Sequence, residues 1–197
     1  MMIFVISAMT CLGASAACHT YFALSYRYNL LMSKLDFTGI TCLIAGSFYP
    51  VIFYGLHCHP ISKMVYMTII SILSLICLRV VTAEHYAGPD YDYARVSLFI
   101  GLGFFGVLPV GQHYYYYGMT ELLEHLLFMT SLYLLGTVFY VGKMPERWFP
   151  GCFDFIGGSH LIWHILVLSA ALVHYRGSMA AYSQVLDMEE MHGGHCN

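Results

Sequence analysis

The segment from Phe155 to Tyr175 reads FIGGSHLIWHILVLSAALVHY. It contains no Lys, Arg, Asp or Glu, and the first charged residue after it is Arg176. An α-helix needs about 20 apolar residues to cross a bilayer, so this segment is predicted to be a membrane-spanning helix. Two of its histidines, His160 and His164, are four residues apart and therefore share one face of that helix.

Placing a histidine within a membrane-spanning helix costs free energy. Polar side chains within the hydrocarbon layer usually face the interior of a helical bundle or a cavity. Two imidazoles that point into a protein from the same helix face suggest a metal site.

The composition of the whole chain is that of a membrane protein. Hydrophobic residues make up 59% of the 197 residues and charged residues only 10%, which is too few charges for an ordinary soluble surface. The net charge of −3 gives no sign of nucleic-acid binding. We predict an all-α membrane protein with one transmembrane domain over residues 1–197, which includes a polar C-terminal tail over residues 176–197. Six apolar runs are long enough to span a bilayer: residues 3–24, 37–56, 61–82, 96–113, 122–141 and 155–175.

The C-terminal end and the cysteines lead to two further expectations. The end of the chain, from Asp187 to Asn197, is polar and is expected to be disordered. The seven cysteines are scattered and include no CxxC pair, so they are expected to be small packing residues and not a disulfide framework. They are Cys11, Cys18, Cys42, Cys58, Cys77, Cys152 and Cys196.

The basic residues predict the orientation in the membrane. With six spans, the first, third and fifth loops lie on one side, and this side holds six of the eight Lys and Arg residues: Arg27, Lys34, Arg79, Arg95, Lys143 and Arg147. Only Lys63 and Arg176 lie on the other side. An excess of Lys and Arg in short loops marks the cytoplasmic side, so both ends of this chain are expected on the outer side.

This topology brings several polar residues to the same depth. His19 lies near the cytoplasmic end of the first span, and Ser15 is one helical turn before it on the same face. Asp36 lies where the second span leaves the same membrane face, and His160 and His164 lie where the sixth span enters from it. Three helices therefore bring three histidines and a carboxylate toward one layer near the cytoplasm.

Three neutral imidazoles suit Zn²⁺, which in catalytic sites takes three protein ligands and leaves a position open for water. Such a water becomes acidic enough to supply hydroxide at neutral pH. Asp36 could shuttle its proton, and Ser15 could orient the water or polarise a substrate carbonyl. The alternative is that each histidine caps a helix or bonds a neighbouring backbone separately; the common depth of all three favours the metal.

The sequence also resembles a known family, the progestin and adipoQ receptors (PAQR), and especially its adiponectin-receptor branch. The resemblance covers nearly the whole chain, and the order and spacing of its motifs are highly specific. These motifs are Ser15-x-x-x-His19, Ser33-Lys34-Leu35-Asp36-Phe37-Thr38-Gly39-Ile40, Gly46-Ser47-Phe48-Tyr49-Pro50, Gly101-Leu102-Gly103, Pro145-Glu146-Arg147-Trp148-Phe149-Pro150-Gly151 and Ser159-His160-x-x-x-His164.

The resemblance implies a fold of seven spans with an extracellular C-terminus, of which the six spans here correspond to the second to the seventh. It implies zinc near the cytoplasmic face, with His19, His160 and His164 as ligands and Asp36 beside the zinc-bound water. It further implies a plasma-membrane receptor for an adiponectin-like extracellular ligand, linked to lipid metabolism through hydrolysis of the ceramide amide bond by zinc-bound hydroxide.

Two rival functions remain to be compared with a zinc hydrolase. A haem bundle would leave one of the three histidines unexplained, because His160 and His164 on one helix cannot be opposite axial ligands of one haem. A non-catalytic receptor or scaffold with a structural zinc uses the same three histidines. The sequence does not separate this second rival from the enzyme, because the two zinc sites differ only in an open coordination position.

Overall fold

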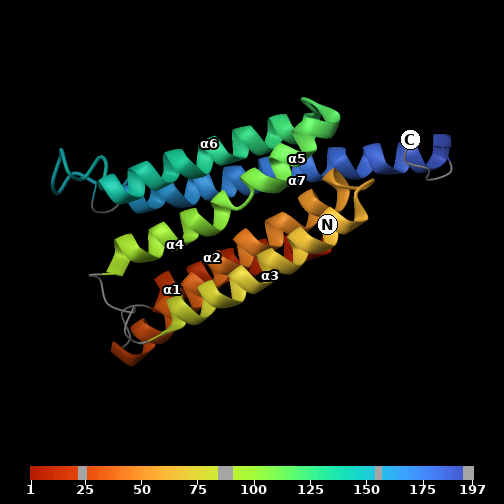
Figure 1. The fold of residues 1–197 in the computed structure, drawn as a ribbon. Coiled ribbons are helices and arrows are strands. Elements are labelled where there is room, and N and C mark those ends of the chain that lie inside the picture. The colour runs from red at the N-terminus through yellow and green to blue at the C-terminus, as the bar shows by residue number, and fades with distance from the viewer. Residues whose placement is uncertain (22–25, 84–90, 154–156, 193–197) are drawn as a thin grey trace. The chain divides into compact units, whose positions relative to one another are not determined.

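The structure, a computed structural model, describes residues 1–21, 26–83, 91–153 and 157–192. These residues form helices and no strand (Figure 1), which confirms the predicted all-α class. The described helices are, in chain order, α1 (Met2–Tyr21), α2 (Tyr26–Gly55), α3 (Pro60–Thr82), α4 (Asp92–Phe104), α5 (Val107–Tyr117), α6 (Glu121–Gly142) and α7 (Ser159–His192).

Five helical stretches among the described residues are long and apolar enough to cross a membrane: Met2–Thr20, Leu30–Gly55, Pro60–Thr82, Tyr93–Tyr117 and Glu121–Gly142. They overlap the first five predicted spans, and the chain is a multi-pass membrane protein. Residues 22–24 of the first predicted span and 155–156 of the sixth lie outside the described part of the chain. Residues 159–175 of the sixth predicted span lie in α7, which is not among these stretches. Three histidines in the first half of α7 lower its mean hydropathy.

The fourth predicted span is divided between α4 and α5. The N–H of Gly106 donates to the carbonyl of Gly103 at 3.0 Å, which tightens the chain between the two helices. Pro109 lies in the first turn of α5. Because proline has no N–H and its ring crowds the preceding turn, an uninterrupted α-helix through this point is unfavourable.

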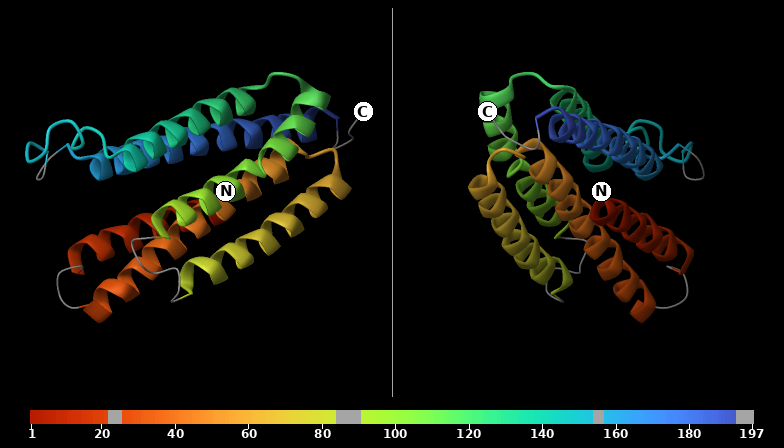
Figure 2. Two further views of the ribbon diagram at one scale, coloured as in Figure 1. Left: turned by 60° about the vertical axis from the view of Figure 1, so that its left-hand side comes forward. Right: turned by 90° about the vertical axis from the view of Figure 1, so that its right-hand side faces the viewer.

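The chain forms two compact units, and each is described by itself. The first unit consists of residues 1–118 and 185–197, and the second of residues 119–184. In the first unit, α2 packs against α1, α3 and α4 (Figure 2).

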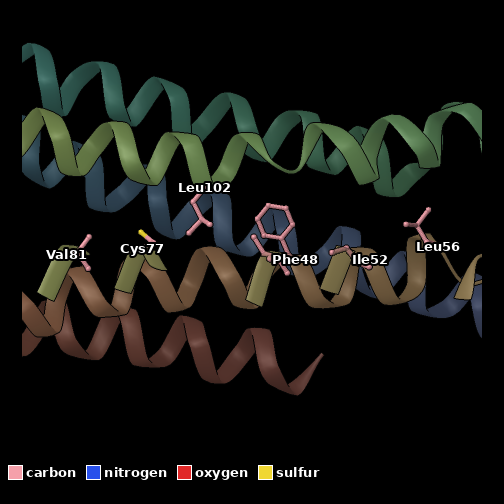
Figure 3. Packing of buried hydrophobic residues seen from close by; sticks show 7 residues of the cluster. Phe48, Ile52, Leu56, Cys77, Val81 and Leu102 are labelled. Carbon is pink, nitrogen blue, oxygen red and sulfur yellow. The ribbon is translucent and has the colours of Figure 1, made fainter. Parts of the chain in front are cut away.

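The apolar core of the first unit lies between α2, α3 and α4. Figure 3 shows Leu102 projecting from α4 toward the side chains of α2 and α3. Two of the core side chains, Ile52 and Ile70, are fully buried. The cluster consists of Phe48, Ile52, Leu56, Ile70, Cys77, Val81 and Leu102. Burying large aliphatic side chains stabilises such a unit by about 1.5–3 kcal/mol each where water is the alternative.

The contact between α1 and α2 depends on glycine. A Cβ atom on Gly39 would lie 2.8 Å from the Cα of Cys11, and one on Gly46 would collide with the side chain of Ser7. Small residues of this kind allow two helix backbones to approach closely in a membrane. The position of α1 against α2, and with it that of His19 at the end of α1, therefore depends on these two glycines.

We expect Gly39→Ala to destabilise the protein by about 1–3 kcal/mol, because the new methyl group overpacks against a backbone atom that cannot move independently. Gly101→Ala is the matched control, since no other described atom lies within 4 Å of its added Cβ. The stabilities of both variants and wild type are compared by thermal unfolding in the same detergent. A Gly39→Ala protein as stable as Gly101→Ala would show that the α1–α2 contact is looser than the structure indicates.

In the second unit, α6 and α7 pack closely along two glycines. A Cβ on Gly136 of α6 would lie 2.9 Å from the indole ring of Trp163, and one on Gly177 of α7 would lie 2.5 Å from the Cβ of His125. Thr120 caps the start of α6: its hydroxyl accepts a hydrogen bond from the backbone N–H of Leu123 at 3.3 Å. Threonine at this position satisfies one of the free amides of the first turn.

The turn between α2 and α3 packs against the end of α5. The Nδ1 atom of His113 is 2.7 Å from the carbonyl oxygen of Gly55, and the rings of His59 and Tyr116 stack with centroids 4.0 Å apart. Tyr117 hydrogen-bonds to the backbone of Cys58. These contacts hold the turn in place.

Cys58, in this turn, is disulfide-bonded. The expectation that the cysteines only fill space is therefore wrong for Cys58, because a cysteine in a turn can find a partner that sequence spacing does not reveal. Cys196 lies outside the described residues. The other five cysteines are free thiols: Cys11, Cys18, Cys42, Cys77 and Cys152.

The expectation that the end from Asp187 onward is disordered is wrong for residues 187–192. The α7 helix continues past Arg176 to His192. The side chains of residues 187–190 are exposed, so this end is helical because adding a turn to an existing helix is less costly than starting a new one. Residues 193–197 lie outside the described part of the chain.

Candidate metal centre

His160 and His164 occupy the first two turns of α7. Their ring centroids are 4.7 Å apart, with the ring planes at 75°, and one nitrogen of each lies within 4.8 Å of one of the other. The two imidazoles therefore share a helix face, as their spacing predicts, and both can present a nitrogen to one ion.

Aromatic side chains surround this pair. The ring of Tyr140, on α6, lies 5.6 Å from that of His160 and 5.9 Å from the indole of Trp163. Trp163 in turn lies against Gly136. Packing between α6 and α7 thus restricts the rotamer of the first histidine.

The start of α7 is held by a carboxylate from the preceding loop. The Oε1 atom of Glu146 accepts hydrogen bonds from the backbone N–H of Ser159 at 2.7 Å and from its hydroxyl at 2.9 Å. The hydrogen bond from its own backbone N–H and those from Ser159 hold the pKa of the Glu146 carboxyl below its usual range. Desolvation opposes this effect, and the nearby His160 also lowers the pKa. Glu146 is therefore ionised at neutral pH.

Asp36 and Ser15 lie in the first unit, on α2 and α1. The Asp36 carboxylate is near enough to the thiols of Cys11 and Cys18 to interact with them electrostatically, and the Ser33 side chain hydrogen-bonds to Cys18. Asp36 thus lies on the side of α2 that faces α1.

Ser15 is 6% exposed. Its Oγ atom is buried and has no hydrogen-bond partner among the described residues. A buried hydroxyl without a partner costs about 1–3 kcal/mol, so this atom has bonding capacity for a ligand or a water.

His19 lies in the last turn of α1. It offers one ring nitrogen from the first unit, and His160 and His164 offer two from the second. Three neutral imidazoles suit Zn²⁺, and the unpartnered hydroxyl of Ser15 is the kind of group that bonds a metal-associated water. The residues present therefore fit the predicted ion.

Three residues near the histidine pair were given no role from sequence alone: Tyr140, Glu146 and Trp163. Glu146 precedes Ser159 by 13 residues, across a loop, so no helical or strand period connects them. Tyr140 is on another helix. The only sequence signal was that Glu146 is part of a recognisable motif, which does not by itself indicate what the carboxylate contacts.

Comparison with known proteins places the chain in a family. Residues 1–175 match the family described as haemolysin-III related. The adiponectin receptor protein of Drosophila melanogaster is 40% identical over 186 residues, which are 91% of this chain and 42% of the relative. The heptahelical transmembrane protein 4 of Arabidopsis thaliana is 37% identical over 186 residues, 92% of this chain and 48% of the relative.

A rice protein, the heptahelical transmembrane protein ADIPOR1 of Oryza sativa subsp. japonica, is 36% identical over 181 residues, 90% of this chain and 48% of the relative. The chain spans about half the length of these relatives. The match to the family over most of the chain confirms the resemblance seen in the motifs. The chain belongs to the haemolysin-III-related (PAQR) family and is an adiponectin-receptor-like membrane protein.

Proposed function

We propose that His19, His160 and His164 are the protein ligands of one zinc ion, and that this site hydrolyses the amide bond of a membrane lipid, ceramide. The observation that carries the proposal is the histidine pair of α7, whose two rings can present a nitrogen each to one ion. His19, in the last turn of α1, is the proposed third ligand. Three protein ligands with a fourth position open are typical of catalytic zinc.

Zinc at this site would supply a Lewis acid and lower the pKa of a water molecule. Asp36 takes the proton from the attacking water and passes it to the leaving amine. Ser15 donates a hydrogen bond from its buried hydroxyl to the carbonyl oxygen as negative charge develops there. Water adds across the C–N bond, and the products are a fatty acid and sphingosine.

The surroundings of the site support a lipid substrate. The helices that carry the proposed ligands expose apolar side chains such as Ile6, Leu161 and Ile165, and these face hydrocarbon in a membrane. A substrate with acyl chains reaches such a site through the bilayer, with its amide near the polar layer where Asp36 lies.

Metal analysis combined with a ceramide hydrolysis assay tests the function. We expect about one zinc per chain and a hydrolysis rate that a chelator abolishes and added zinc restores. Protein without bound zinc would contradict the proposal. Protein with bound zinc but no turnover, in the presence of an active ceramidase control, would exclude the catalytic function.

A structural zinc in a non-catalytic receptor or scaffold is the second candidate. It is suggested by the electrostatic proximity of Asp36 to the thiols of Cys11 and Cys18, which gives this carboxylate neighbours other than a metal-bound water. In this case the ion holds helices together and Asp36 affects its affinity but no reaction.

The receptor function is proposed from the relatives. A Drosophila relative is named an adiponectin receptor protein, so we propose an adiponectin-like extracellular ligand and a place in the plasma membrane. The disulfide at Cys58 supports the predicted orientation, because disulfides form and persist on the oxidising, extracytoplasmic side. The zinc site then lies toward the cytoplasm and the C-terminus outside.

This orientation predicts which cysteines a membrane-impermeant thiol reagent reaches in intact cells. Cys58 should be labelled only after an impermeant reductant opens its disulfide. Cys152, a free and exposed thiol in the loop before α7, should be labelled only after permeabilisation. Peptide mapping by mass spectrometry identifies the labelled residue, with surface expression verified separately. Labelling of Cys152 in intact cells would reverse the orientation.

A further inference from the structure

We propose that Glu146 is a positioning residue for the metal centre: its carboxylate anchors the first turn of α7 and thereby sets the place of the His160 ring. The inference rests on the proposed zinc site, and it assigns a role to a side chain that the chemistry above does not use.

The anchoring follows from the ends of helices. The first amides of a helix have no partner within it, and the helix dipole favours a negative charge beside them. The Oε1 atom of Glu146 accepts hydrogen bonds from both the backbone N–H and the hydroxyl of Ser159, at 2.7 and 2.9 Å. One ionised oxygen therefore binds the first residue of α7 at two points, which fixes its backbone and its side chain together.

The neighbouring glycine shows how tightly the carboxylate fits. A Cβ on Gly158 would lie 2.9 Å from the Oε1 atom of Glu146. Any larger residue at position 158 would push the carboxylate away from Ser159. The close approach of Glu146 to the helix thus depends on the absence of a side chain at this position.

His160 directly follows the anchored serine. A shift or fraying of the first turn moves its imidazole, while His164 is one turn further inside the helix and is less affected. Glu146 also interacts electrostatically with His160. A residue that fixes the position of a metal ligand in this way tunes the affinity of the site for its ion.

The experiment compares zinc affinity in Glu146→Ala, Glu146→Gln and the control Arg147→Ala, an exposed neighbour in the same loop. Chelator competition on the purified chain gives the Kd for zinc. We expect Glu146→Ala to weaken zinc binding by roughly 10–100-fold. Glu146→Gln should recover part of the loss because it keeps an accepting oxygen, and Arg147→Ala should match wild type.

A second readout separates positioning from general destabilisation. The visible spectrum of the cobalt-loaded protein depends on ligand geometry, so Glu146→Ala should shift its bands while Arg147→Ala should not. If Glu146→Ala does not fold, Gly158→Ala serves in its place, since its methyl group displaces the same carboxylate.

The possible failures are distinct. Wild-type protein that binds no zinc would overturn the proposed function, and the positioning role with it. Wild-type protein that binds zinc, with an unchanged Kd and cobalt spectrum in Glu146→Ala, would overturn the positioning role alone. Equal losses in Glu146→Ala and Arg147→Ala would also overturn it, because the loop and not the carboxylate would then be responsible.

Discussion

Replacing His160 or His164 by alanine should reduce zinc binding by more than the roughly 10–100-fold that loss of a group behind a metal ligand costs. Each imidazole is one of three proposed ligands, and two histidines alone leave the ion with too few protein donors for a stable tetrahedral site. A triple variant that also lacks His19 should hold no zinc. The zinc content of the single and triple variants is measured by metal analysis after dialysis against a weak chelator.

His125→Ala provides the comparison for this experiment. His125 lies in the second unit but is not one of the proposed ligands. Its Nδ1 atom is hydrogen-bonded to the carbonyl oxygen of Glu121 at 2.8 Å. The His125→Ala variant should retain zinc at the wild-type level. If the triple variant holds as much zinc as wild type, the three histidines are not the ligands.

Asp36→Asn should keep zinc bound and lower ceramide hydrolysis by at least about 10²-fold, the loss expected when a general acid–base group is removed. The amide is nearly the same size as the carboxylate, so the packing around position 36 should change little. It cannot, however, accept the proton that hydrolysis releases. Zinc content and hydrolysis rate must be measured on the same preparations.

Glu121→Gln is the matched control, because Glu121 lies in the first turn of α6, on the predicted outer side. It removes the same charge and should leave the rate unchanged. Turnover that Asp36→Asn does not alter would exclude Asp36 from the reaction. A fall in zinc affinity without an effect on the rate per bound zinc would instead support the structural-zinc candidate.

The sequence was sufficient where the physical signal is local. The length of an apolar run predicts a span, and the five stretches from Met2 to Gly142 agree with it. A spacing of four on a helix places two side chains on one face, and His160 and His164 are found together. Neither conclusion needs knowledge of another helix.

Hydropathy did not predict helix ends in polar segments. The second helix begins at Tyr26, well before the apolar run at residue 37, and Ser33 in this polar turn bonds the side chain of Cys18 on α1. The last helix likewise continues through the polar residues after Arg176 to His192, and Ala181 and Val185 in its extension are buried. Hydropathy does not report on partners that are distant in sequence.

The sequence by itself therefore determined the membrane class, the positions of the spans and the candidate ligands, because each depends on neighbours within one helix. Only the tertiary structure decided what supports those ligands. Glu146 reaches Ser159 across a loop, Tyr140 reaches His160 from another helix, and Cys58 forms its disulfide in a turn whose partner no local spacing indicates. Such contacts depend on how the chain packs, since residues far apart in sequence meet only after the helices have associated.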